Sequence, residues 1–169
     1  VRARLGGALP PGAWRNRLIA ADNRVALAAL AAECAGQVAC IYIDPPFATG
    51  TAFQTTAPAG APQPAYTDQH GGLAPYLQMM YERLLLMRPL LSPRGSIFVH
   101  LDWHAAHYVK LLLDEVFGVE RFRNEIIWRY RRWPSRARLF QRMHDTIFWY
   151  GASDATPPWH QPYEALSPS

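Results

Sequence analysis

Cysteine is scarce in this sequence of 169 residues, which contains only Cys34 and Cys40. Two cysteines are too few for a framework of disulfides, and their spacing does not form the CxxC pair of many redox sites. We therefore expect two buried free thiols in a protein of a reducing compartment.

Long hydrophobic runs are also missing. The first residues, VRARLGGALPPGAW, lack the apolar core of a secretory signal peptide. The run LLLMRPLL is interrupted by Arg88 and Pro89 and is too short to span a bilayer. The sequence thus predicts a soluble, cytoplasmic protein that does not enter a membrane.

Lysine occurs once, at Lys110, so arginine supplies nearly all of the positive charge. The 17 basic and 13 acidic residues give a net charge of +4, and half of the residues are hydrophobic. This composition is typical of a globular domain, and its positive charge suits a polyanionic partner. Arginine binds phosphate in a bidentate manner, but a GC-rich genome would favour the same residue. Composition alone does not decide whether the abundance of arginine reflects phosphate binding or the base composition of the genome.

A strand, a helix and a second strand are predicted near the start. Residues 1–15 are expected to be an irregular lead-in, and residues 18–21 a short strand. A helix is expected over residues 24–35, where Asp22 or Asn23 would cap its start and Gly36 would suit its end. Residues 38–43 (VACIYI) form a short apolar run rich in β-branched residues, which is typical of a buried parallel strand. Together these elements predict a βαβ unit.

The rest of the sequence continues this alternation. Its expected elements are a long loop over 48–74, a helix over about 75–91, a strand over 96–101, a helix over 103–117 that ends at Gly118, strands near 124–130 and 145–150, and a proline-rich linker from Gly151. Alternating strands and helices predict an α/β domain with a mostly parallel sheet. Ligands of such sheets bind at the carboxyl ends of the strands, where Asp22, Asp44 and residues 100–102 are expected.

The tetrapeptide Asp44-Pro45-Pro46-Phe47 follows the second strand and carries the clearest chemical signal. The lone pair of an exocyclic amine such as adenine N6 is delocalised into the ring, so this nitrogen is a poor nucleophile. Two acceptors aimed at its N–H bonds would free the lone pair, and the Asp44 carboxylate and the Pro45 carbonyl supply them. Phe47 could stack on a base that has swung out of the duplex. A rigid turn after a strand is the structural alternative for these four residues.

The motif and its surroundings resemble DNA amino-methyltransferases of the permuted group, which includes the modification subunits of type III restriction-modification systems. The matching segments are Asn16–Ile19, Asp22-Asn23, Ile41–Gly50, Tyr76–Leu84, Gly95–His100, Asn124–Trp128 and His144–Ile147. These segments form an ordered series that covers residues 16–150. The resemblance implies a partial Rossmann-like class I methyltransferase fold and transfer of a methyl group to adenine N6 of double-stranded DNA. It also implies a restriction subunit as a partner and leaves a homodimer open.

The resemblance implies S-adenosylmethionine as the cofactor, with Asp22 and Asp44 beside it. For Asp22, an ordinary helix cap is an equal alternative. The family's Phe-x-Gly-x-Gly cofactor turn comes late in the chain, and no two glycines of this sequence are spaced i, i+2. We therefore expect either a fragment or one half of a split enzyme, in which residues 16–150 are the catalytic part and 151–169 lead toward an absent target-recognition region.

An arginine-rich stretch interleaved with aromatic residues runs from Arg121 to Arg142. Arginines neutralise phosphates, and aromatic rings pack or stack on bases. The residues expected to bind DNA, on both sides of Pro134, are Arg131, Arg132, Arg136 and Arg138. Arg121 and Arg123 are expected to be structural instead, and a solvated strand edge is the alternative for the whole stretch.

Two further groups leave other functions open. His100, Asp102, His104 and His107 are closely spaced, but two of these histidines are expected on a helix and no metal site is predicted. Thr49, Gly50 and Phe53 begin the long loop, which could close over a flipped base or be a disordered insertion. The alternatives to adenine methylation are cytosine N4 methylation, which Asp44 in place of a serine disfavours, DNA binding without catalysis, and a metal hydrolase.

Overall fold

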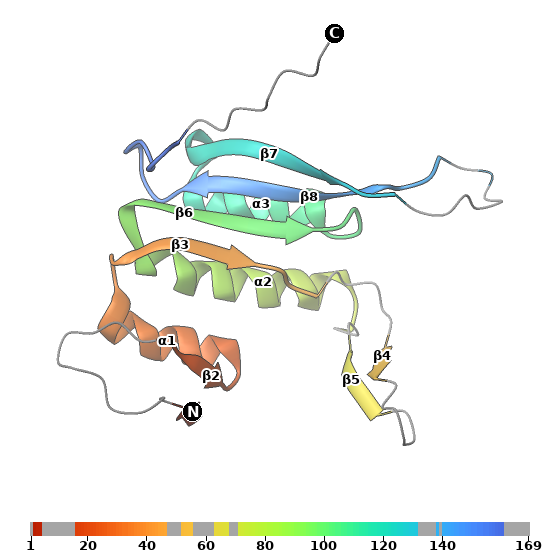
Figure 1. Ribbon diagram of the computed structural model, residues 1–169, viewed down its shortest axis with the longest axis horizontal. Coiled ribbons are helices and arrows are strands. Elements are labelled where there is room, and N and C mark those ends of the chain that lie inside the picture. Colours follow the sequence, from red (N-terminus) through yellow and green to blue (C-terminus); the bar gives the residue numbers. More distant parts are fainter. Residues whose placement is uncertain are drawn as a thin grey trace, which may run out of the picture.

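The computed structural model describes residues 2–4, 16–46, 52–55, 63–67, 71–131, 138 and 140–160. Its centre is a sheet with the strand order β3-β6-β8-β7. These strands are β3 (Val38–Ile43), β6 (Leu91–Leu101), β7 (Phe122–Arg129) and β8 (His144–Gly151). Figure 1 shows helices behind the sheet, so the expected α/β class is confirmed.

The sheet is mixed, whereas a mostly parallel sheet was predicted. Among the described strands, only β3 and β6 form a parallel pair, and β8 runs antiparallel to both β6 and β7. β3, β6 and β7 therefore run in one direction and β8 in the other. The reason is that β7 and β8 follow each other in the chain and pair directly, so that the chain reverses its direction between them.

Two helices cover one face of the sheet and form the core with it. α2 (Leu73–Met87) connects toward β6, and α3 (Ala106–Phe117) connects β6 to β7. Both lie behind the sheet in Figure 1. The fully buried side chains that fill this interface are Tyr76, Met80, Leu84, Ile97, Val99, Leu101, Val109, Leu113, Phe117 and Tyr150.

The strand β3 has the predicted bounds, but it is not the buried strand that its apolar sequence indicated. It lies at the edge of the described sheet and is half-exposed, with Tyr42 at 56%. Cys40 is exposed and Cys34 is half-buried, and both thiols are free. The expectation of buried thiols is therefore wrong. Cys40 is exposed because β3 has a neighbour on one side only among the described residues, and Cys34 lies at the end of the helix that precedes β3.

The first strand and helix also differ from the predicted βαβ unit. α1 (Asn23–Cys34) lies within one residue of its expected bounds. However, β2 (Leu18–Ala20) pairs antiparallel with β1 (Arg2–Arg4) and not with the central sheet. The strand β1 also means that the lead-in is not wholly irregular, since its main chain finds a hydrogen-bonding partner in β2.

The long loop contains a hairpin, because β4 (Ala52–Thr55) pairs antiparallel with β5 (Gln63–Thr67). After it, α2 ends at Met87 and a 3₁₀ turn, η1 (Arg88–Leu90), leads into β6. β6 begins five residues earlier than predicted and includes Pro93, which lies where the pairing with β3 shifts its register. A register shift tolerates a proline because no ladder hydrogen bond is needed there.

The last helix begins later than expected, and the tail after β8 contacts the sheet. α3 begins at Ala106 rather than at residue 103, and Gly118 follows it with φ 99°. A second 3₁₀ turn, η2 (Val119–Arg121), leads into β7. The tail contacts the sheet, because the Ala152 N–H donates to the Gly95 carbonyl at 2.9 Å and the Trp159 ring stacks on Trp149. Within the part of the chain that is described, no helix has the length and apolarity needed to cross a membrane.

Candidate active site

Two of the three predicted strand ends meet at one edge of the sheet. β3 and β6 run parallel with Ile43 beside Val99, so Asp44 and His100 follow at neighbouring positions. Asp102 comes directly after β6 and is buried. The sequence therefore correctly placed Asp44 beside the region 100–102, and Asp22 belongs to a different part of the fold, after β2.

The described part of the motif is a turn that leaves the sheet at this edge. Asp44 is exposed, and Pro45 and Pro46 are half-buried. Phe47 lies outside the described residues, as do Thr49 and Gly50. The exposed carboxylate and the fixed direction of a proline-rich main chain can both present acceptors to a ligand above the strand end.

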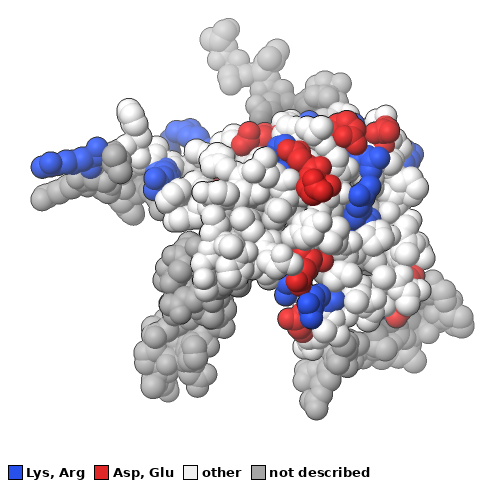
Figure 2. Space-filling view, turned by 180° about the vertical axis from the view of Figure 1, so that it is seen from behind, with Lys and Arg blue, Asp and Glu red and all other residues white. Residues whose placement is uncertain are grey.

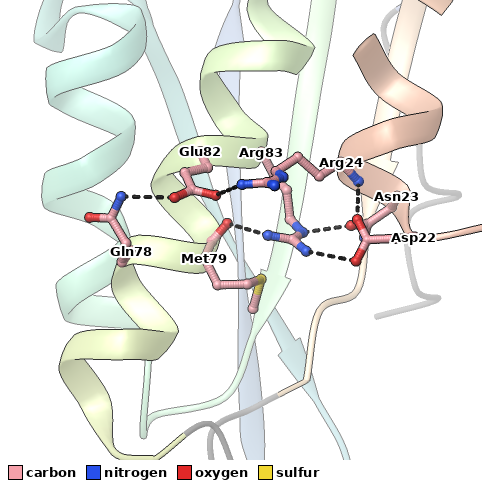
Figure 3. A network of polar contacts seen from close by, with 7 residues as sticks. All are labelled: Asp22, Asn23, Arg24, Gln78, Met79, Glu82 and Arg83. Atoms are coloured by element: carbon pink, nitrogen blue, oxygen red, sulfur yellow. Dashed lines mark hydrogen bonds and ion pairs between the residues drawn. The ribbon is translucent and has the colours of Figure 1, made fainter. Parts of the chain in front are cut away.

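Asp22 caps α1, as one of its two interpretations requires. Its carboxylate accepts a hydrogen bond from the Arg24 N–H at 2.8 Å, and its carbonyl accepts one from the Ala26 N–H at 3.0 Å. Arg83 of α2 lies 3.7 Å from the same carboxylate and donates to the Asn23 side chain at 2.6 Å. Figure 3 shows that these contacts join the start of α1 to α2.

A second ion pair continues this connection. Arg24 lies 3.1 Å from Glu82 of α2, and Gln78 donates to the other Glu82 oxygen at 3.1 Å (Figure 3). These hydrogen bonds, from Gln78 first and then from Arg24, hold the pKa of Glu82 below its ordinary value. The start of α1 is thus fixed by polar contacts to one face of α2.

A polar chain crosses the sheet next to Asp44, and sequence reasoning missed most of it. The Tyr42 hydroxyl lies 2.8 Å from His100 Nδ1, and His100 Nε2 lies 3.4 Å from Asp145. Tyr130 donates to the other Asp145 oxygen at 3.1 Å. Partial burial, and then the negative charge of Asp44, raise the pKa of Tyr42. The period-two spacing of Tyr42 and Asp44 was the available signal, because alternate residues of a strand share one face.

The turn after β6 explains the closely spaced histidines and aspartate. Asp102 accepts hydrogen bonds from the main-chain N–H of His104, at 2.9 Å, and from the His104 ring. His104 therefore belongs to this turn rather than to a helix, while His107 is on α3 and exposed. Among the described residues, no three side chains of histidine, cysteine, aspartate or glutamate converge on one point.

The same turn exposes an aromatic ring. Trp103 is 43% exposed, lies against the His104 ring, and has the Arg142 guanidinium 3.5 Å from its centroid. The contact between Trp103 and Arg142 was not predicted from the sequence, because 39 positions separate these residues in the chain. A cation over an indole face is a favourable arrangement that orders both side chains.

The arginines of the β7–β8 region divide into two groups. Arg121 and Arg123 donate to the carbonyls of Ala152 and Ser153, at 3.3 and 2.9 Å, and so hold the tail. Of the residues predicted to bind DNA, Arg131 and Arg138 are exposed, while Arg132 and Arg136 lie outside the described residues. Figure 2 shows basic side chains gathered on the arm that projects beyond the ends of β7 and β8.

The fold and the turn at its carboxyl edge define a Rossmann-like α/β domain. The structure is similar to that of M1.HpyAVI in complex with SAM, with a TM-score of 0.57 and 16% identity over 88% of this chain and 60% of that chain. At this identity, the likeness shows the fold alone.

The chain belongs to the DNA methylase family, whose sequence pattern matches residues 38–167. The type II methyltransferase M.EcaI of Enterobacter cloacae is 40% identical over 114 residues, or 68% of this chain and 24% of that protein. The probable type III restriction-modification enzyme HindVI Mod subunit of Haemophilus influenzae is 34% identical over 110 residues, or 64% of this chain and 13% of that protein. The chain thus spans about a quarter or less of the length of these relatives.

Proposed function

We propose that residues 16–150 are the catalytic part of a DNA methyltransferase that methylates adenine N6. One observation carries the proposal: the Asp44-Pro45-Pro46 turn leaves the carboxyl end of β3 beside the end of β6, in a chain of the DNA methylase family. Ligands of α/β sheets bind at this edge. Within the described part of the chain, the exposed Asp44 carboxylate has no hydrogen bond or ion pair, and a role toward a ligand explains its place.

The turn acts on the amino group by accepting its hydrogen bonds. One N–H of the base points to the Asp44 carboxylate and the other to the Pro45 carbonyl, which draws the nitrogen toward a tetrahedral geometry and localises its lone pair. With a methyl donor bound, the N–C bond would form as the donor's bond to its methyl group breaks, and the two acceptors would stabilise the positive charge that develops on the nitrogen. The nitrogen would then lose one proton to water at the exposed strand end. Phe47 stacks on the base that has left the duplex.

We propose S-adenosylmethionine as the methyl donor, because M1.HpyAVI was crystallised with SAM and the family methylates DNA. When bound, it supplies an electrophilic methyl group. Asp22 and Asp44 are the residues of this chain proposed to face it. Their fit is partial, since no Phe-x-Gly-x-Gly turn occurs in these 169 residues. Methyl transfer is therefore expected only together with a segment that supplies such a turn.

Double-stranded DNA is the proposed substrate, bound through Arg131, Arg132, Arg136 and Arg138. Two of these side chains are exposed on the arm beyond β7 and β8 (Figure 2), where they can reach phosphates. The names of several relatives as Mod subunits support a restriction subunit as a further partner. Homodimer formation is proposed on the resemblance alone.

The test is a substitution at the proposed acceptor. Asp44→Ala and Asp44→Asn in the longest reading frame that contains this chain should abolish transfer of a labelled methyl group and leave the Kd for DNA nearly unchanged. Asp154→Ala is the matched control, because this carboxylate is 84% exposed and far along the chain from the turn. Full activity of Asp44→Ala would refute the assigned role. DNA binding without methyl transfer by the unsubstituted protein would instead support a non-catalytic binding module.

A further inference from the structure

The chain Tyr42–His100–Asp145 joins three adjacent strands on the face of the sheet that α2 and α3 leave uncovered. The residues come from β3, β6 and β8, and the contacts measure 2.8 and 3.4 Å. Phe98 and Trp149 lie on the same face and stack on each other at 5.5 Å. The polar chain therefore runs between an aromatic cluster and the strand ends that carry Asp44.

The inner members of the chain are shielded and the outer member is not. The side chains of His100 and Asp145 are 15% and 16% exposed, whereas Tyr42 is 56% exposed. A side chain as large as tyrosine on an edge strand would ordinarily sample several rotamers. The bond to His100 restricts Tyr42 to one of them, and Asp145 restricts the imidazole in turn.

The directions of the protons follow from the partners. The raised pKa of Tyr42 keeps its hydroxyl protonated, so this O–H can donate to His100 Nδ1. A neutral imidazole that accepts at Nδ1 carries its proton on Nε2, which faces Asp145. Asp145 also accepts from Tyr130. The hydrogen bonds thus lead from the exposed Tyr42 hydroxyl through His100 to the partly buried carboxylate of Asp145.

We propose that Tyr42, held by His100 and Asp145, is the wall against which a planar purine ring packs beside Asp44. His100 and Asp145 are then positioning residues, and the flat, exposed phenol is the contact surface. Aromatic rings fixed in one rotamer bind planar ligands well, because no rotamer freedom is lost on binding. The inference rests on the proposed function. The purine can be the target adenine or the adenosine part of the methyl donor, and the experiment separates these sources.

Kinetics of the enzyme that contains this chain give the first test. Tyr42→Ala should lower kcat/KM by roughly ten- to a hundredfold. Tyr42→Phe, His100→Gln and Asp145→Asn should each lower it by a smaller factor. Tyr42→Phe and His100→Gln should not be additive, since both remove the same hydrogen bond. Tyr108→Phe and His107→Gln on α3 are the controls, because both side chains are exposed on another element.

The parameter that changes identifies the purine. A lower kcat or a higher KM for DNA, with an unchanged KM for S-adenosylmethionine, assigns the wall to the target adenine. A higher KM for S-adenosylmethionine alone assigns it to the donor. If Tyr42→Ala leaves all of these values unchanged, the proposal is overturned. Equal losses of thermal stability in every variant, with unchanged kinetics, would also overturn the proposal. The contacts between Tyr42, His100 and Asp145 would then have a structural role only.

NMR of the 169-residue chain tests the inference without methyl transfer. The imidazole ¹⁵N shifts of His100 should show a proton on Nε2, and Tyr42→Phe should move them. Added adenosine should shift the Tyr42 ring protons of the unsubstituted chain, and His100→Gln should weaken this response. Absence of any adenosine effect on Tyr42 would contradict the proposed wall. A positive result beside an inactive enzyme would show that the proposed reaction fails and the purine contact holds.

Discussion

The buried Tyr150 hydroxyl donates a hydrogen bond to the Asp114 carboxylate, and their oxygens lie 2.5 Å apart. This contact joins β8 to α3. Lys110, one turn earlier on α3, binds the same carboxylate at 2.7 Å and lies 4.4 Å from the Phe122 ring centroid. The only lysine of the sequence is thus partly buried and held by Asp114 and the Phe122 ring.

Asp114→Ala should lower the free energy of unfolding by about 3 kcal/mol, because it leaves a buried hydroxyl and an ammonium group without their acceptor. Chemical denaturation at neutral pH measures this value. Glu115→Ala is the control, since the neighbouring side chain is exposed. Equal stability of both variants would contradict the role of the contact.

Lowering the pH should remove the stabilisation that the contacts of Asp114 provide. Burial alone would raise the pKa of Asp114, but the hydrogen bonds from Lys110 and Tyr150 outweigh it and lower the pKa below 3.8. A carboxyl group whose pKa is lowered in the folded state stabilises the fold fully at a pH above its ordinary pKa. This stabilisation is lost as the pH falls through the pKa of the folded state. The stability difference between the unsubstituted protein and Asp114→Ala should therefore be constant above about pH 5 and shrink below pH 3.8.

Substitution of Asp22 separates its two interpretations. Asp22→Ala should cost about 1 kcal/mol, because the cap of α1 is lost. Asp22→Asn keeps an oxygen for the Arg24 N–H and should restore most of this stability. If Asp22 also contacts the methyl donor, Asp22→Asn should still bind it more weakly in the complete enzyme, as calorimetry would detect. Unchanged donor affinity would leave Asp22 a helix cap only.

Gly95 allows β3 and β6 to approach each other. A Cβ at this position would lie 2.8 Å from the Val38 carbonyl oxygen and 3.0 Å from that of Ser92, and neither main-chain atom can move freely. Gly95→Ala should destabilise the protein by roughly 1–3 kcal/mol, and Gly95→Ser by at least as much. Thermal unfolding measures both, and a neutral Gly95→Ser would show that the strands lie farther apart.

The exposed arginines of the β7–β8 arm should control the salt dependence of DNA binding. Arg131→Gln and Arg138→Gln should each reduce the slope of log K against log [salt] by about 0.9, the value for one phosphate contact. Arg17→Gln is the control, because this arginine pairs with Glu33 at 2.5 Å and belongs to another surface. Fluorescence anisotropy at several salt concentrations gives the slopes. An unchanged slope in both variants would place the DNA elsewhere.

Local patterns predicted the elements better than their pairing. α1 and β3 were found within one residue, because apolar periodicity and the flanking Asp22 and Gly36 are local signals. That β2 pairs with β1, and that β8 inserts between β6 and β7, depends on contacts distant in sequence. No periodicity encodes such a choice, so the separate small sheet and the mixed central sheet could not be foreseen.

The candidate site shows the same division. Asp44 could be predicted from a four-residue motif at a strand end, and its neighbour His100 from the end of the next strand. The bonds of His100 to Tyr42 and Asp145 depend on the register of three strands, which only the structure gives. Likewise, the prolines of the tail gave no sign that Trp159 packs on Trp149.

The central claim is that the Asp44 turn directs methyl transfer to adenine N6, and the modified base itself tests it most directly. The reading frame that contains this chain is incubated with labelled S-adenosylmethionine and mixed-sequence DNA, and the DNA is digested to nucleosides for mass spectrometry. The account predicts label in N6-methyladenine with the unsubstituted protein and none with Asp44→Ala. Label in N4-methylcytosine, or label on adenine that survives Asp44→Ala, would contradict it.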